Sequence, residues 1–160
     1  MDTTTAPEIT AAASNAPAER REYRVHKVNE PGKKACEAVL RELQEHIWDL
    51  RSAGVVGPDG FEISWISTGP IGVSKIAALT STLVAVGQAF MQEAGIKTFR
   101  DVILDTEDGC ALLLSVPVEN ATYGLFVITG KHTLLGNILL WARVCAHQVQ
   151  EALVKARKES

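Results

Sequence analysis

Two short segments in the carboxyl-terminal half of the chain are apolar at almost every position. Residues 111–116 read ALLLSV, and residues 125–128 read LFVI. A strand with one face in water alternates apolar and polar side chains, so uninterrupted runs indicate strands that are covered on both faces. The two segments therefore predict a sheet with helices above and below it.

The remaining strands are predicted from turn signals. PDG at residues 58–60 separates two apolar segments, and the second of these alternates from Phe61 to Trp65. EDG at residues 107–109 and EN at residues 119–120 mark two further turns. Such short connections make neighbouring strands antiparallel. The predicted strands are residues 50–57, 61–68, 99–106, 110–116 and 123–129.

Three segments have the pattern of helices. The first begins near Pro31, a residue suited to the first helical position, and its apolar residues recur at positions i, i+3, i+4 and i+7. The second spans about residues 72–94 and stops at Gly95, and the last spans about residues 134–155. The stripe of the first helix comprises Cys36, Val39, Leu40, Leu43 and Ile47.

The order of these elements is helix, two strands, helix, three strands, helix. It predicts an α/β (α+β) fold in which a mainly antiparallel five-stranded sheet has helices on both faces. The chain has 160 residues, which suits one domain with a tail. We expect residues 1–18 to be a disordered tail, residues 19–30 a basic extension with a possible extra strand, and residues 31–158 the domain.

The second predicted helix is unusual because it carries few charges on any side. Large side chains are predicted on one side and small side chains on the other. One side must cover the sheet, and the small side suits the close approach of another helix. The large set is Ile76, Leu79, Leu83, Val84, Phe90 and Met91, and the small set is Ala78, Ser81, Ala85 and Ala89.

Composition excludes several classes of function. The formal net charge of −3 gives no long-range attraction for a phosphate backbone, so we expect no nucleic-acid partner. The first residues lack the basic start and apolar run of a secretory signal, and the chain has no CxxC pair, so a reducing cytoplasm is expected. Residues 71–91 are the most apolar stretch, but Lys75, Gln88 and several hydroxyl residues interrupt them, which argues against membrane insertion.

No motif points to catalysis, a metal or a cofactor. Cys36 and Cys145 lie on apolar helical stripes and are predicted in the core, whereas Cys110 follows a turn and is expected to be more accessible. The histidines lack metal-ligand spacing, and the glycines form no phosphate loop. The acidic residues around the turn at 107–109 are interpreted as protection of a sheet edge.

Four segments together resemble the Roadblock/dynein-light-chain family, in particular its bacterial stand-alone members. The resemblance covers roughly residues 31–155, although Leu134 stands where many members have Asn before Leu-Gly. The four segments are GPDGFEIS (57–64), ALTSTLVAVGQAFMQEAG (78–95), VILDTEDGCALLLSVP (102–117) and GLFVITGKHTLLGNILLWA (124–142).

The resemblance implies a profilin-like Roadblock fold and a homodimer in which the second helices pack together and sheet edges join. It also implies a non-enzymatic regulator or scaffold that acts on a small Ras-like GTPase or a multiprotein assembly. Ala78, Ser81, Ala85 and Ala89 are then the dimer-interface candidates, and Arg51, Arg100 and Arg143 are candidates for contact with the partner. The alternative is a ligand-sensing module with a small pocket between sheet and helices.

Overall fold

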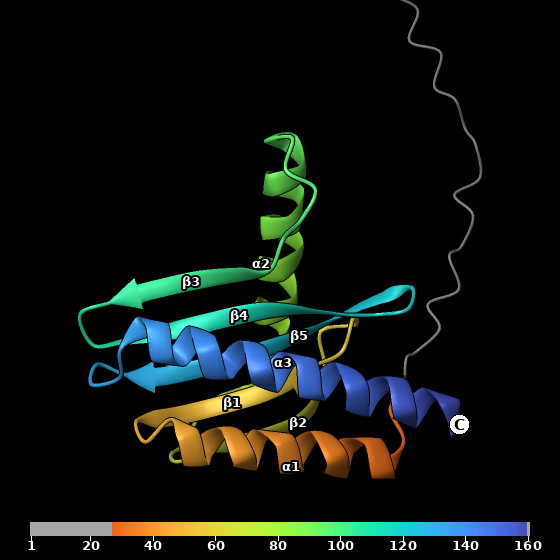
Figure 1. Cartoon of the computed structure of the whole chain (residues 1–160), viewed down its shortest axis with the longest axis horizontal. Coiled ribbons are helices and arrows are strands. Elements are labelled where there is room, and N and C mark those ends of the chain that lie inside the picture. The colour runs from red at the N-terminus through yellow and green to blue at the C-terminus, as the bar shows by residue number, and fades with distance from the viewer. Residues whose placement is uncertain (1–26, 160) are drawn as a thin grey trace, which may run out of the picture.

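The elements of the folded chain follow the predicted order. The computed structural model describes residues 27–159, so the predictions for residues 1–18 and for most of the basic extension lie outside the described residues. The elements are α1 (Glu30–His46), β1 (Leu50–Val56), β2 (Glu62–Ser67), α2 (Val73–Glu93), β3 (Asp101–Thr106), β4 (Gly109–Val118), β5 (Ala121–Gly130) and α3 (Leu135–Lys158) (Figure 1).

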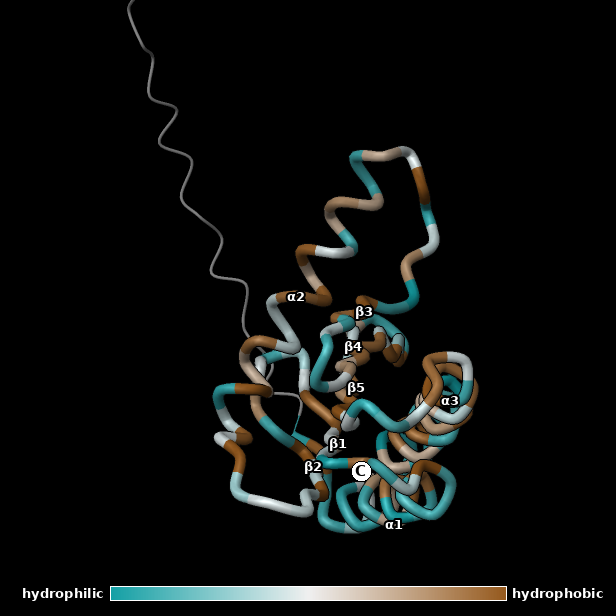
Figure 2. The backbone as a smooth tube through the Cα atoms, turned by 90° about the vertical axis from the view of Figure 1, so that its left-hand side faces the viewer, coloured by the Kyte–Doolittle hydropathy of each residue, from teal (hydrophilic) through white to brown (hydrophobic). Residues whose placement is uncertain are grey.

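The five strands form one sheet in the order β2-β1-β5-β4-β3, and every neighbouring pair is antiparallel. Helices α1 and α3 lie side by side on one face, and α2 lies on the other face and crosses the strands (Figures 1 and 2). The strands at the two edges of the sheet are β2 and β3. The predicted α/β fold with helices on both faces is confirmed.

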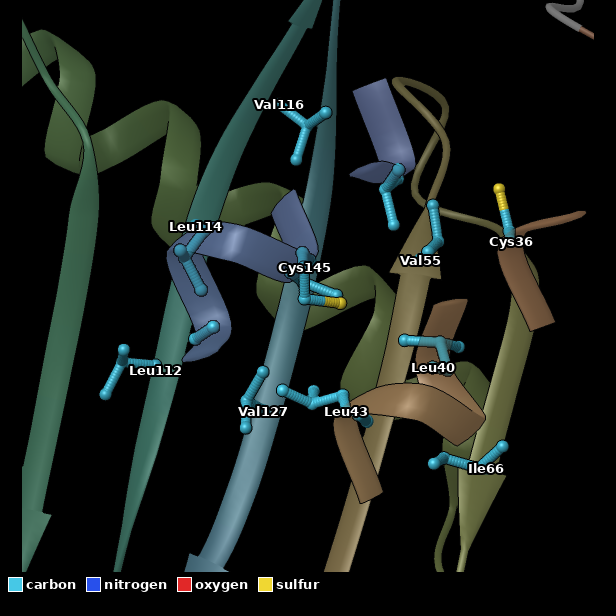
Figure 3. Packing of buried hydrophobic residues seen from close by; sticks show 14 of the residues in the cluster. Cys36, Leu40, Leu43, Val55, Ile66, Leu112, Leu114, Val116, Val127 and Cys145 are labelled. Carbon is cyan, nitrogen blue, oxygen red and sulfur yellow. The ribbon is translucent and has the colours of Figure 1, made fainter. Parts of the chain in front are cut away.

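Strands β4 and β5 are buried on both faces, as their apolar runs predict. Leu112, Leu114 and Val127 belong to the core between the sheet and the α1–α3 layer (Figure 3). Leu113 and Phe126 point the other way, into a smaller core under α2. Alternate side chains of each strand point to opposite faces of the sheet, and both faces are buried. Neither strand therefore has a face that is occupied by polar side chains.

The α1–α3 layer is fastened near both of its ends. The Asn29 side chain accepts a hydrogen bond from Gly32 N at 2.9 Å, which caps α1 just before Pro31. The same side chain donates to Ala156 O at the end of α3, at 3.3 Å. At the other end the His46 ring stacks on Trp141, with 3.6 Å between ring centroids. These contacts hold the two helices parallel to the strands that they cover.

Helix α2 contacts the sheet along a narrow line of small and medium side chains. Only Ala77, Thr80 and Val84 of this helix are buried. Thr80 lies on Gly124 of β5, where an added Cβ would be 3.1 Å from the threonine methyl. The carboxyl-terminal half of α2 rises past β3, and residues 95–100 return to the sheet (Figures 1 and 2).

The prediction that the large side chains of α2 gather on its covered side is wrong for two residues. Leu79 is 59% exposed and Phe90 is 71% exposed. The physical reason is the direction of the helix, because α2 crosses the strands and passes beyond β3. The end of its large side, with Phe90, therefore has no sheet beneath it, whereas Leu79 lies over the sheet on the side of α2 that turns away from the buried Ala77, Thr80 and Val84. A single sequence gives helical periodicity but not the angle at which a helix crosses a sheet.

A glycine in β1 makes room for the ring of Phe126. A Cβ at Gly54 would lie 2.5 Å from Cε1 of that ring and 3.1 Å from Cβ of Trp65. We expect Gly54→Ala to lower the free energy of unfolding by about 1–3 kcal/mol, because the buried ring has no space to move into. Urea unfolding measures the change. Gly69→Ala is the control, since nothing lies within 4 Å of its added Cβ, and equal stability of the two variants contradicts the packing described.

Candidate interaction surface

Large apolar side chains are exposed on the outward side of α2, on the neighbouring edge strand β3 and in the connection between them. Leu79, Val86 and Phe90 project from α2, with Val86 58% exposed. Ile103 and Leu104 of β3 are also exposed, as is Ile96 in the connection between the two elements. Exposed apolar side chains gathered on neighbouring elements make this part of the molecule a candidate site of interaction with another molecule. We call these six residues the α2–β3 surface.

Small side chains lie next to this surface on α2. Ala78, Ala85 and Ala89 are exposed, whereas Ser81 is half-buried beside Gly60 of the β1–β2 turn. Three of the four dimer-interface candidates therefore lie on the exposed part of the helix. The large residues Leu79, Val86 and Phe90 are functional candidates that sequence reasoning missed, because their exposure depends on the crossing angle of α2.

The outer edge of β3 has unpaired backbone groups. β3 is hydrogen-bonded to β4 on one side, and no other strand of residues 27–159 pairs with it. Arg100 O accepts a hydrogen bond from Ser115 N of β4 at 2.9 Å. Because successive residues of a strand alternate in direction, Asp101, Ile103 and Asp105 present their N–H and C=O groups to the open side. This edge is a template for another strand.

A hollow of about 520 Å³ lies beneath the part of α2 that passes the edge of the sheet. One wall belongs to α2 and the other to residues 98–102. Arg100 and Asp101 are the charged residues of the lining, which is otherwise mainly apolar: Leu83, Val86, Phe90, Met91, Phe99 and Val102. The hollow opens beside the start of β3, so it is part of the same surface.

Two of the three arginines that were candidates for contact with a partner, Arg100 and Arg143, line the same hollow of about 410 Å³, whereas Arg51 lies apart from them. Arg143 of α3 donates from Nε and Nη2 to Oδ2 of Asp101, at 3.1 and 3.0 Å. Arg100 is exposed at the hollow. Arg51 is exposed on β1, and two strands lie between β1 and β3. In the hollow that Arg100 and Arg143 share, Arg143 is already bonded to the Asp101 carboxylate.

The cysteines have no features of a reactive site. Burial raises the pKa of the Cys36 thiol to about 11 and that of the Cys145 thiol to about 12. Cys110 is buried as well, so the expectation that it is accessible is wrong. Burial and the nearby Asp105 carboxylate both raise its pKa. Among residues 27–159, no group of three or more His, Cys, Asp and Glu side chains could hold a metal ion.

A second, smaller apolar surface lies on the opposite layer. Trp48 is 75% exposed and lies 5.8 Å from His132 between ring centroids, and Leu134 precedes α3 close by in sequence. Leu140 and Val144 are exposed farther along α3. Sequence reasoning did not single out these residues. The exposure of Leu140 and Val144 follows from the way α3 turns only one of its sides toward the sheet.

Only α2, of the helices in the described part of the chain, is long and apolar enough to pass for a membrane span, by length and composition alone. The same length and apolar composition are expected of a helix whose outer side contacts another protein. A membrane is therefore not needed to explain the composition of α2, and its exposed side belongs to the α2–β3 surface.

No family model and no curated protein matches the sequence. Solved structures nevertheless give the class of fold. A Roadblock/LC7 domain from Streptomyces avermitilis superposes with a TM-score of 0.58 at 18% identity, over 77% of this chain and 95% of that chain. The chain therefore has the Roadblock/LC7 fold, and the resemblance of its motifs is confirmed at the level of the fold.

Structures of the protein MglB are also similar to this chain. MglB of Myxococcus xanthus gives a TM-score of 0.70 at 18% identity, over 81% of this chain and 96% of that chain. An MglB structure described as having a tetrameric arrangement gives 0.70 at 19% identity, over 80% and 93% of the two chains. The gliding protein MglB of Thermus thermophilus gives 0.68 at 18% identity, over 82% and 95%.

Proposed function

We propose that the protein is a non-enzymatic, homodimeric regulator or scaffold that acts on a small Ras-like GTPase or on a multiprotein signalling assembly. The observation that carries this proposal is the exposed apolar side of α2 together with the open edge of β3. The Roadblock/LC7 fold and the likeness to MglB support the choice of regulator over enzyme. The cytoplasm is its expected location.

The geometry at β3 favours a second copy of this chain as the first partner. A strand of a second copy can pair with the open edge and so extend the sheet past β3. The half of α2 that rises past β3 then has a sheet beneath it, and the hollow under it is filled. A two-fold axis gives both copies the same contacts, which is the arrangement that most dimers adopt.

The residues of the exposed side of α2 suit such an interface. Leu79, Val86 and Phe90 supply apolar area, and their burial is favourable by about 1.5–3 kcal/mol for each fully buried side chain. Ala78, Ala85 and Ala89 let another helix approach closely. No Asp, Glu, Lys or Arg lies between Ser81 and Gln92 on this helix, so association buries no charge there.

The first expected outcome concerns self-association. The wild-type chain should have about twice the 17.3 kDa of one protomer by light scattering at micromolar concentration. Ala85→Glu and Val86→Glu should each weaken the dimer by about 100-fold or more, because each buries an unpaired carboxylate in the interface. Both positions are exposed in the protomer, so the variants should fold.

The matched control for these variants is Gln44→Glu. It adds the same charge at an exposed position of α1, on the other layer of the molecule, and should remain a dimer. A monomeric wild type at micromolar concentration rules out the dimer. If the wild type is a dimer and neither Ala85→Glu nor Val86→Glu weakens it, the contact between the two copies lies elsewhere on the molecule.

The second expected outcome concerns a GTPase captured from lysate with a GTP analogue. The purified protein alone should neither bind nor hydrolyse GTP, since it lacks a phosphate loop. It should change the rate of hydrolysis by the captured GTPase. Arg143 is engaged by Asp101, and Arg51 and Arg100 do not converge, so we expect the effect to come from positioning the loops of the GTPase.

Single-turnover hydrolysis with Arg51→Ala and Arg100→Ala separates the two mechanisms. Positioning predicts that each substitution reduces the effect by less than about 10-fold, whereas loss of a transferred arginine costs about 10³-fold or more. A complex that forms without any change in rate indicates a scaffold. Absence of both complex and rate change contradicts a role on GTPases.

The hollow under α2 is the observation that favours the alternative, a ligand-sensing module. Its volume of about 520 Å³ and mainly apolar lining suit a small apolar ligand. The hollow, however, lies at the edge of the sheet and inside the proposed dimer interface. A ligand in the hollow would compete with the second copy of the chain, so the second copy is the simpler occupant.

A further inference from the structure

We propose that Arg143 neutralises two carboxylates across the dimer interface: Asp101 of its own chain and Asp105 of the second copy. This inference rests on the proposed dimer and assigns the residue that makes an acidic edge strand able to pair with itself. It also gives Arg143 a role different from contact with a GTPase.

The register of the paired strands follows from the direction of the backbone groups. Asp101, Ile103 and Asp105 are the residues of β3 that face the open side. A two-fold axis at Ile103 pairs all three: Ile103 with its counterpart, and Asp101 with Asp105 of the second copy, twice. An axis at Val102 or Leu104 pairs only two of the three within the strand. The axis at Ile103 therefore makes the most hydrogen bonds.

This register also matches the apolar residues of the two strands. Ile103 lies opposite Ile103 of the second copy on the face of the sheet that α3 covers. On the α2 face, Val102 lies opposite Leu104 of the second copy. Cross-strand pairs of branched apolar side chains stabilise a sheet. The charged pair formed by Asp101 and Asp105 is thus the one unfavourable contact in the register.

The repulsion between the carboxylates of Asp101 and of Asp105 in the second copy must be offset by a nearby positive charge. Asp101 and Asp105 lie on the same side of the strand, so both side chains point to the α3 face, where Asp101 meets Arg143. Directly opposite residues have Cβ atoms about 5 Å apart, and like charges at that distance destabilise the pairing. Glu107 and Asp108 add further negative charge at the end of the strand. Without a cation on this face, β3 would resist pairing with itself.

Arg143 is placed to supply the compensation. Its Nε and Nη2 atoms bind a single oxygen of Asp101, Oδ2, at 3.1 and 3.0 Å, so its remaining N–H groups are available to a second carboxylate. The side chain is 45% exposed, and a hollow of about 410 Å³ that both residues line lies beside the pair. Asp105 of the second copy would enter this space. The two-fold axis repeats the arrangement.

The test is a cycle of variants measured by the dissociation constant of the dimer. Arg143→Gln should weaken the dimer by about 10- to 100-fold, because the carboxylates of Asp101 and Asp105 then face each other without a cation. Adding Asp105→Asn should restore the dissociation constant to within about threefold of wild type, since the repulsion is removed. Arg143→Lys keeps the charge and should retain most of the affinity.

The matched control is Arg157→Gln on the same helix. Arg157 also forms an ion pair, with Glu119 at 3.2 Å, but it lies at the far end of α3 from Arg143 and β3. Its substitution should leave the dimer unchanged. Thermal unfolding of each variant checks the fold, and the half-exposed position of Arg143 makes a folding defect unexpected.

Different failures have different meanings. A wild-type chain that stays monomeric overturns the dimer and this inference with it. A wild-type dimer whose affinity Arg143→Gln leaves unchanged overturns the role of Arg143 and leaves the dimer intact. If Arg143→Gln weakens the dimer but Asp105→Asn does not restore it, Arg143 acts only within its own chain, and the inference is overturned.

Discussion

Burial of β4 and β5 on both faces is the constraint on which the rest of the molecule depends. Leu112 and Leu114 need the α1–α3 layer, while Leu113 and Phe126 need α2 on the opposite face. Strands of this kind leave unfavourable apolar surface in water unless both layers are present. The caps and contacts that fix α1 against α3, and the glycines of β1 and β5 that let side chains approach the sheet closely, all serve this double coverage.

The two layers are unequal, and the difference produces the exposed α2–β3 surface. Helices α1 and α3 run along the strands and cover the sheet broadly, whereas α2 crosses the strands with only three buried side chains. The rest of α2 extends past β3 with Val86 and Phe90 exposed. The same crossing that covers Leu113 and Phe126 therefore leaves an apolar helix face and an open strand edge together.

Much of this architecture was predictable from local sequence. Apolar runs, turn signals and helical stripes predicted eight elements in the right order, because each depends on residues close together in the chain. The exposure of Leu79 and Phe90, the burial of Cys110 and the pairing of Arg143 with Asp101 were not predictable. Each depends on how elements distant in sequence cross or meet. Local sequence therefore singled out α2 as an unusually uncharged helix but did not show which of its side chains face outward.

The most direct measurement of the central claim, that the edge of β3 pairs with a second copy, is amide hydrogen exchange at residue resolution over a range of protein concentrations. We predict that the amides of Asp101, Ile103 and Asp105 become protected as the concentration passes the dissociation constant of the dimer. The open edge of β2 serves as an internal reference and should exchange at the same rate throughout. Exchange at Ile103 that stays fast and independent of concentration, in a sample with the mass of a dimer, would contradict pairing through β3.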